Sequence, residues 1–99
     1  MLLTTTGKAV VIPAVAGKSI RVKSYAITNY GAANAVVDII DRVGADEVNL
    51  ATDATFDAHR IHRDDDDDGV IVTRPGAELV VNMKAAVVVN IRINWWYVP

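Results

Sequence analysis

The alternation of apolar and polar residues is most regular near the C-terminal end of the chain. From Val87 to Tyr97 every second residue is large and apolar, and the residues between them are mostly polar. Strict alternation over this length is typical of an extended strand with one face on a core and the other facing outward, whereas a helix would scatter the same residues around its circumference. We therefore predict a long half-buried strand that runs to Val98, and an all-β fold.

Shorter strands are expected upstream, separated by turns rich in Gly, Pro and Asn. These strands are predicted at Lys8–Ile12, Ser19–Thr28, Ala35–Arg42, Val70–Thr73 and Glu78–Met83. Residues 48–62 fit mostly loop and strand, with a helical turn near residues 53–58 as an alternative. The spacing predicts a single small β-sandwich or a small barrel, with about seven to eight antiparallel strands over residues 8–99. The N-terminal arm, residues 1–7, is either disordered or docked on a neighbouring chain.

The strand expected at Ser19–Thr28 changes character along its length. Strict alternation would place Ile20, Val22, Ser24 and Ala26 on one face and Arg21, Lys23, Tyr25 and Ile27 on the other. The second face is then polar at first and apolar from Tyr25 onward. This change suggests that the far half of the strand is covered, for example by another chain. The strand expected at Ala35–Arg42 is apolar on both faces, as in a central strand.

Composition narrows the function classes. Hydrophobic residues make up 52% of the 99 residues, which favours an oligomer or a subunit docked on a partner. The net charge of −2 argues against a nucleic-acid-binding protein. The chain has no cysteine, which excludes disulfides and thiolate metal sites and fits assembly in a cytoplasm. No apolar run approaches the roughly 20 residues that a membrane-spanning helix requires, so no membrane association is expected.

The run from Asp64 to Asp68, followed by Gly69, is the most conspicuous polar motif. It matches the first half of a calcium loop, which needs oxygen ligands on alternating residues and a glycine at the sharp turn. The twelfth loop position, where a bidentate Glu should stand, is Pro75. We therefore expect a solvated loop, or a contact with a basic patch on a partner, and keep calcium binding as the alternative.

His59 and His62 are spaced three residues apart and could in principle ligate zinc. No helical pattern surrounds them to aim both imidazoles at one ion, so a polar loop or an interface strand is the preferred interpretation. The only serines, Ser19 and Ser24, lie within a strand pattern without a nucleophile motif. We expect a protein that is not an enzyme, with no catalytic residue, no cofactor and no metal.

Trp95 and Trp96 are adjacent in the last strand and must point to opposite faces. With Trp95 in the core, Trp96 lies outside. An exposed tryptophan is a favoured anchor of protein interfaces. It could instead be a platform on which a sugar stacks, or be covered by another part of the same chain.

Two stretches of the chain resemble small structural proteins of tailed bacteriophages. Residues 16–25, AGKSIRVKSY, resemble the opening strand of these proteins, and residues 74–89, RPGAELVVNMKAAVVV, resemble their closing stretch, with its strand ending in Trp96-Tyr97-Val98. The resemblance covers residues 16–98 and rests on the hydrophobic pattern and the placement of turns. Such proteins are compact β-sandwiches, often jelly-roll-like, so the resemblance implies a single small jelly-roll-like β-sandwich. Many of them are head decoration (cement) proteins, commonly trimers over capsid symmetry axes.

The resemblance implies a non-enzymatic virion structural protein, most simply a capsid decoration protein that stabilises the head by binding across neighbouring shell subunits. Its partners would be further copies of itself, with a homotrimer favoured, and the major capsid protein or another virion protein. It would be assembled in the host cytoplasm and lie on the capsid surface. The alternative is a tail or fibre-associated module that binds glycan or calcium. The residues expected at the interface are Met1, Leu2, Leu3, Tyr25, Ile27, Arg92 and Trp96.

Overall fold

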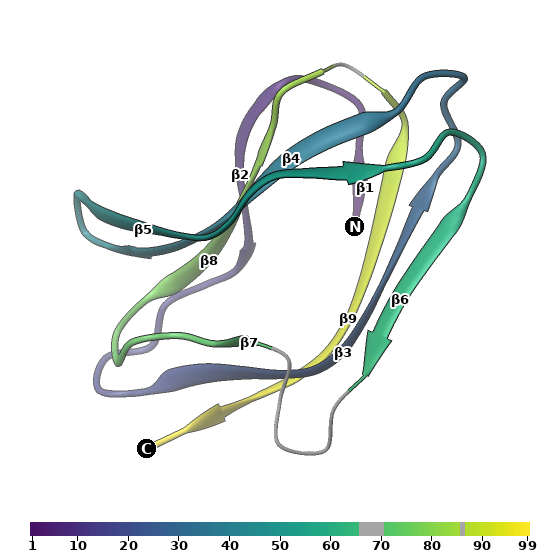
Figure 1. Cartoon of the computed structure of the whole chain (residues 1–99). Helices are drawn as coiled ribbons and strands as arrows, with labels where there is room; N and C mark the ends of the chain where they lie inside the picture. Colours follow the sequence, from purple (N-terminus) through teal and green to yellow (C-terminus); the bar gives the residue numbers. More distant parts are fainter. Residues whose placement is uncertain (66–70, 86) are drawn as a thin grey trace.

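The computed structural model describes residues 1–65, 71–85 and 87–99, and these residues form nine β-strands and no helix (Figure 1). The strands are β1 (Leu2–Leu3), β2 (Gly7–Ile12), β3 (Ser19–Asn29), β4 (Ala35–Val43), β5 (Asp46–Phe56), β6 (Ile61–Asp65), β7 (Ile71–Val72), β8 (Glu78–Met83) and β9 (Val89–Val98). One sheet has the order β1-β9-β3-β6, with β7 also paired to β3, and the other has the order β2-β8-β4-β5. All pairings are antiparallel, and the predicted all-β sandwich is confirmed.

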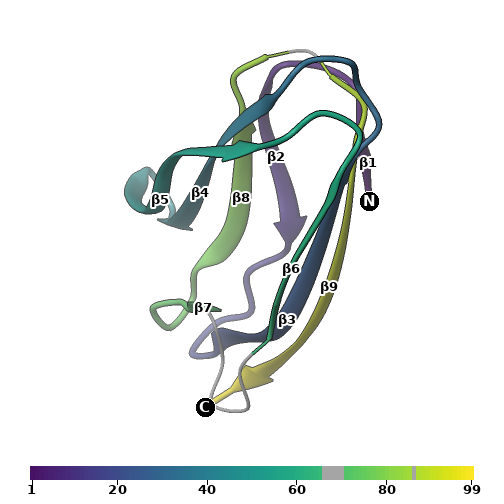
Figure 2. The ribbon, with the colours of Figure 1, turned by 45° about the vertical axis from the view of Figure 1, so that its right-hand side comes forward.

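The strands pair in order from the two ends of the sequence towards its middle. β1 pairs with β9, β2 with β8, β3 with β6 and β7, and β4 with β5. These pairs together form one long antiparallel hairpin. The hairpin is rolled up, so that β9 also pairs with β3 and β8 also pairs with β4. The result is the connectivity of a jelly roll, in which β6 and β7 share one strand position. Figure 2 shows the two sheets facing each other across the interior.

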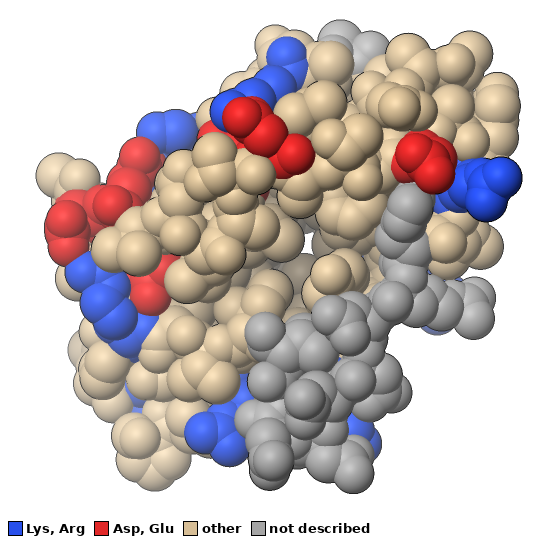
Figure 3. Space-filling model, in the orientation of Figure 1, with Lys and Arg blue, Asp and Glu red and all other residues tan. Residues whose placement is uncertain are grey.

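The core lies between the sheets and consists of two clusters. The larger cluster contains Ile27, Ala35, Val37, Phe56, Val81, Met83, Val89 and Ile91, and the smaller contains Ile12, Ile20, Val22, Ile39 and Leu79. A gap of about 20 Å³ between them is lined only by apolar residues and Tyr25. It is large enough for one water molecule but offers no good partner for one. The surface is hollowed where the sheets part (Figure 3).

The faces of β3 differ from the prediction because this strand contains a bulge. Val22 pairs with Trp95 and Ser24 pairs with Asn94, so the register shifts by one residue at Lys23, the extra residue of β3. One extra residue reverses the alternation of inward and outward side chains. The apolar half of β3 therefore turns into the core, and the predicted division of this strand into two faces is wrong beyond Lys23.

The bulge also explains the apolar residues that seemed to need a covering partner. Ile27 is only 4% exposed and belongs to the larger core cluster, and Tyr25 is partly buried against that cluster. The opposite sheet of the same chain covers both residues, so their hydrophobicity needs no second chain to account for it.

The N-terminal arm docks on its own chain, which corrects the expectation of disorder or of docking on a neighbour. Leu2 and Leu3 pair with the first residues of β9. The N-terminal ammonium donates a hydrogen bond to the carbonyl of Ile91 at 2.6 Å, and the Ile91 N–H donates to the carbonyl of Met1 at 2.7 Å. Leu3 packs against the larger core cluster. The arm is thus the first strand of the sheet.

The uncertain central stretch of the sequence is mostly strand, and the alternative helical turn near residues 53–58 does not form. β5 continues from Asp46 to Phe56, with two register shifts against β4. Asp53 has a φ of 53°, a left-handed conformation that interrupts the strand. The carboxylate of Asp38 accepts a hydrogen bond from the Asp53 N–H at 2.8 Å, and this bond holds the irregular backbone in place. β4 is buried on both faces, as predicted for a central strand.

Candidate functional site

The outer face of the β9–β3 ladder is the candidate functional site. The alternation of β9 places its even-numbered residues outward, opposite the outward residues of β3 across the ladder. In register, these pairs are Asn90 with Thr28, Arg92 with Ala26, Asn94 with Ser24 and Trp96 with Arg21. This face therefore combines amide, hydroxyl and guanidinium groups with one indole ring. Groups of these kinds can bind a ligand through hydrogen bonds and ring stacking.

A shallow depression of about 250 Å³ lies in the middle of this face. Its lining comprises Ser24 and Ala26 of β3 and Arg92, Ile93 and Asn94 of β9. The depression exists because the small side chains of Ser24 and Ala26 stand beside the longer side chains of Arg92 and Asn94. The polar side chains of the lining offer both donors and acceptors of hydrogen bonds.

Trp96 extends this face beyond the depression and is 37% exposed. It lies two residues after Asn94 on the same strand, opposite Arg21 of β3, and Arg21 is in turn opposite Val72 of β7. The Nε of Arg21 is buried and has no hydrogen-bond partner among the described residues. A buried donor without an acceptor is costly, so an acceptor oxygen that reached Arg21 would be stabilised there.

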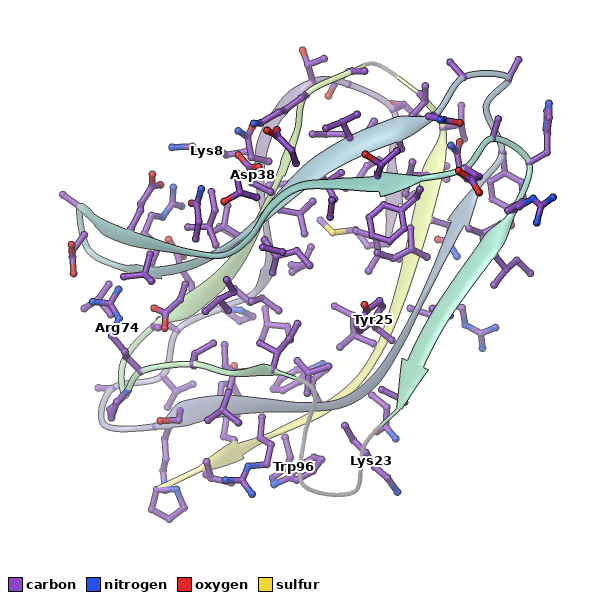
Figure 4. All side chains as sticks on the ribbon, in the orientation of Figure 1. Lys8, Lys23, Tyr25, Asp38, Arg74 and Trp96 are labelled. Atoms are coloured by element: carbon purple, nitrogen blue, oxygen red, sulfur yellow. The ribbon has the colours of Figure 1, made fainter. Side chains whose placement is uncertain are left out.

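The described charged side chains on this side of the ladder are all basic, in a chain whose net charge is −2. They belong to Arg21, Lys23 and Arg92. Figure 4 shows Lys23 and Trp96 at the same end of the sheet. A basic face with an exposed tryptophan matches an acidic or hydroxyl-rich partner surface better than it matches a basic one.

The aspartate run begins beside this ladder, at the edge of the sheet. The backbones of Asp64 and Asp65 pair with Tyr25 and Ser24 of β3. The rest of the run, residues 66–68, and Gly69 lie outside the described residues, so the calcium alternative stays open.

The two histidines lie in the turn before β6 and within β6 itself. His59 is exposed in the turn before β6, with a φ of 55°, and its N–H donates to the carbonyl of Gly31. The backbone of His62 pairs with Ile27 in β6, and the side chain of His62 lies outside the described residues. Among the side chains that are described, no group of three His, Cys, Asp or Glu residues could hold a metal ion.

Ion pairs gather on the other sheet and on its connections. One group joins Lys8, Arg42, Glu47 and Glu78, a second joins Arg74 to Asp41 and Asp46, and a third joins Lys84 to Asp38 and Asp53. Acidic and basic side chains accordingly lie next to one another over β4 and β5 (Figure 3). These charges neutralise each other, and the groups tie neighbouring strands together.

The pKa shifts in these groups indicate a structural role rather than acid–base chemistry. The hydrogen bond from the Asp53 N–H lowers the pKa of Asp38, and the hydrogen bond from Lys8 lowers the pKa of Glu47. The hydrogen bond to Asp53 raises the pKa of Lys84. Each shift favours the charged form at neutral pH, whereas a general acid or base requires a pKa moved toward the working pH.

The structure brings together two of the seven predicted interface residues, Arg92 and Trp96, on either side of Asn94 on the outer face. Met1 and Leu2 are 52% and 59% exposed at the edge of the same sheet. Leu3, Tyr25 and Ile27 face the core, where they would meet a partner only if the sandwich opened. An interface role stays a prediction for all seven residues.

Sequence reasoning missed Arg21, Ser24, Ala26 and Asn94 as parts of one face. Their alternation along each strand was visible, but Arg21 and Ser24 are three residues apart and share a face only because of the bulge at Lys23. Predicting the depression would have required knowing that β3 and β9 are neighbours in the sheet.

No protein-family model matches this sequence, and no curated protein is similar to it. The residues that the structure describes include no helix long and apolar enough to cross a membrane. The chain is a small jelly-roll β-sandwich whose outer β3–β9 face is polar, carries an exposed tryptophan and has only basic groups among its described charged side chains.

Proposed function

We propose that this chain is a non-enzymatic structural protein of a virion, a decoration protein that binds across neighbouring shell subunits through the outer face of β3 and β9. The observation that carries the proposal is the placement of Arg92 and Trp96 on one exposed face, beside a shallow depression. Tryptophan and arginine are the residues most enriched at binding hot spots. The jelly roll is used by viral capsid domains as well as by lectins and cupins, which supports the proposal by analogy of fold alone.

A decoration protein works by adding buried surface at the junctions of a shell. An interface of roughly 800 Å² per partner is enough for stable association. Because every copy contacts the shell at a symmetry-related position, several modest contacts within one oligomer add up to firm attachment. A rigid sandwich suits this task, since binding then orders few additional groups.

The non-enzymatic part of the proposal is supported by the character of the charged groups. The shifted pKa values of Asp38, Glu47 and Lys84 favour the charged forms of these three groups. The depression on the outer face contains a serine, but the neighbouring described side chains supply no general base to activate it.

The test uses virions produced from the viral genome that encodes this chain. Mass spectrometry of purified virions should detect the chain in a fixed ratio to the shell protein. Purified wild-type protein should rebind to particles that lack it, and Trp96→Ala or Arg92→Ala should weaken this binding at least about tenfold, as expected of hot-spot residues. Val48→Ala, at an exposed position on the other sheet, is the matched control and should bind like wild type. Absence of the chain from virions would overturn the proposal, as would rebinding unaffected by both variants.

A tail or fibre-associated module that binds glycan is the second candidate. The observation that favours it is the polar depression next to the indole of Trp96, since sugars combine ring stacking with hydrogen bonds to amide and guanidinium groups. Soluble oligosaccharides should then change the tryptophan fluorescence and raise the melting temperature by mass action, and Trp96→Ala should abolish the rise. A rise produced by calcium alone would instead indicate a cation site. No rise with either ligand argues against the module.

A further inference from the structure

Among the described strands, only β1 and β3 pair with β9, and over most of its length the side of β9 away from β3 is a free edge. Ile91 and Met1 exchange both of their backbone hydrogen bonds, so the odd-numbered residues of β9 point their N–H and C=O groups away from β3. β1 covers only the beginning of this edge, and beyond Ile91 no other strand lies beside β9 in the described part of the chain (Figure 2). The residues whose backbone groups face this open side are Ile93, Trp95 and Tyr97.

The other three edges of the sandwich carry features that discourage pairing with another chain. β2 contains a register shift near its end and is followed by Pro13. β5 has two register shifts, and its Asp53 is left-handed. β6 has the sequence IHRDD, which is rich in charge, and β7 has only two residues. β9 is regular along its whole pairing with β3, because the bulge lies on β3, and its only charged residue is Arg92.

The free segment of β9 is complementary to itself. It runs from Arg92 to Val98, and its midpoint is Trp95, a residue whose backbone N–H and C=O groups point towards the open edge. An antiparallel partner related by a two-fold axis at Trp95 would place residue 92 opposite 98, 93 opposite 97 and 94 opposite 96. The odd-numbered residues, whose backbone groups point towards the open edge, would then lie opposite each other and form about six backbone hydrogen bonds. Pro99 lacks an N–H and would end the pairing next to Met1, where the edge is already occupied.

The side chains in this arrangement are also compatible. Arg92, the only charge, lies opposite Val98 of the other copy, and no like charges face each other. On the inner face Ile93 meets Tyr97, which extends the apolar row of one sandwich into the next. On the outer face Asn94 meets Trp96, so each indole gains a cross-strand neighbour.

We infer that two copies of this chain associate through the free edges of β9 to form one continuous sheet across a two-fold axis. This pairing uses the free β9 edge of both copies and therefore gives a dimer, whereas the phage resemblance implies a trimer. It does not depend on the proposed virion role, because it involves only this chain.

A cysteine trap tests the register directly, since the chain has no cysteine of its own. In the double variant Asn94→Cys, Trp96→Cys, the two thiols of one copy would face those of the other in non-hydrogen-bonded pairs, at a Cα separation of about 4.5 Å that allows disulfides. Mild oxidation should yield a covalent dimer as the main product. The control double variant Asn90→Cys, Arg92→Cys places no thiol opposite another and should stay monomeric under denaturing, non-reducing conditions. Equal cross-linking of the two variants, or none in either, would overturn the inference.

Light scattering of the wild-type protein at micromolar concentration should give twice the mass of one chain. The double variant Asn94→Asp, Trp96→Asp should raise the dissociation constant about tenfold or more, because like charges then face each other twice. Mixing it with Asn94→Lys, Trp96→Lys should restore a dimer that contains one copy of each. Both variants change outward side chains, and cooperative unfolding confirms their fold. A wild-type monomer or trimer, or a mixture that fails to pair, would contradict the inference.

Discussion

The carboxylate of Asp41 accepts hydrogen bonds from both the backbone N–H of Arg74, at 2.8 Å, and its Nε, at 3.1 Å. Asp41 is 2% exposed near the end of β4, and Arg74 lies in the turn between β7 and β8 (Figure 4). The guanidinium also reaches Asp46 at the start of β5. Hydrogen bonds to Asp46 and Asp41 raise the pKa of Arg74, so the group stays charged. One arginine thus ties the β7–β8 turn to the hairpin of β4 and β5.

This relationship predicts unequal effects of removing the two carboxylates. Asp41→Ala should lower the melting temperature by several degrees, because it leaves the Arg74 N–H without its acceptor in a buried place. Asp46→Ala should lower it only slightly, since the Asp46 side chain is 71% exposed and its ion pair is screened by water. Thermal unfolding followed by circular dichroism measures both. Equal losses would contradict the assignment of Asp41 as the anchor.

Asn29 is predicted to be a stabilising residue of the β3–β4 loop. Its side chain is fully buried, donates to the carbonyls of Ala33 and Phe56, and accepts a hydrogen bond from the N–H of Gly31. Asn29→Ala should lower the free energy of unfolding by about 2–3 kcal/mol, because it leaves buried backbone groups unsatisfied. The control is Asn34→Ala at an exposed position, where the loss should be clearly smaller. Urea denaturation gives both values, and similar losses would sink the prediction.

The gap between the two core clusters predicts a stabilising substitution. Val81 lines this gap and is 5% exposed, so Val81→Ile should place one more methylene group in contact with apolar neighbours. The expected gain is about 0.5–1 kcal/mol, or a rise of a few degrees in melting temperature. Val80→Ile is the control, since Val80 is fully buried but does not line the gap and should be overpacked. A loss of stability in Val81→Ile would show that the gap cannot accept the added group.

The bulge on β3 predicts that two single-residue deletions have opposite outcomes. Deleting Lys23 removes the extra residue of the bulge and leaves every other residue of β3 on its present face, so the protein should still fold cooperatively. Deleting Ala26 shifts the residues beyond it by one position and moves Ile27 from the core to the outer face, so the protein should lose its cooperative transition. Denaturation curves distinguish these outcomes. Loss of folding in both deletions would mean that the bulge itself is required.

Acid should destabilise the protein through Asp38 and Glu47. Their pKa values are lowered in the folded state from usual values of 3.8 and 4.5. Because the folded state prefers the charged form, this stabilisation is complete above the usual values and is lost as the pH falls below them. Asp38→Asn should therefore show a shallower loss of stability between about pH 5 and pH 3 than wild type does. Denaturation across this range measures the difference, and parallel curves would exclude a contribution from Asp38.

The strands with long regular patterns were predictable because alternation is a local property. The last strand was expected to run to Val98, and β9 ends there. Strands at residues 8–12, 35–42 and 78–83 also match β2, β4 and β8 closely. In each case the face of the strand that contacts the core must be apolar, and this requirement is visible in the residues of the strand itself.

The candidate face could be anticipated only in part. Arg92 and Trp96 were placed outward on β9 from alternation alone. Their neighbours on β3 could not be, because the bulge at Lys23 is a property of the pairing between two strands that are about 70 residues apart in the chain. Tyr25 and Ile27 were assigned to a partner for the same reason.

The amino-acid sequence by itself determined that this chain is a small all-β sandwich with an outward tryptophan near its end, because hydrophobic periodicity dictates which residues of a strand can be buried. The tertiary structure alone decided the jelly-roll order of the strands, the docking of the arm on β9, the depression between Ser24 and Asn94, and the free edge beyond Ile91. These features depend on which distant strands exchange backbone hydrogen bonds, and every residue except proline carries the same donor and acceptor.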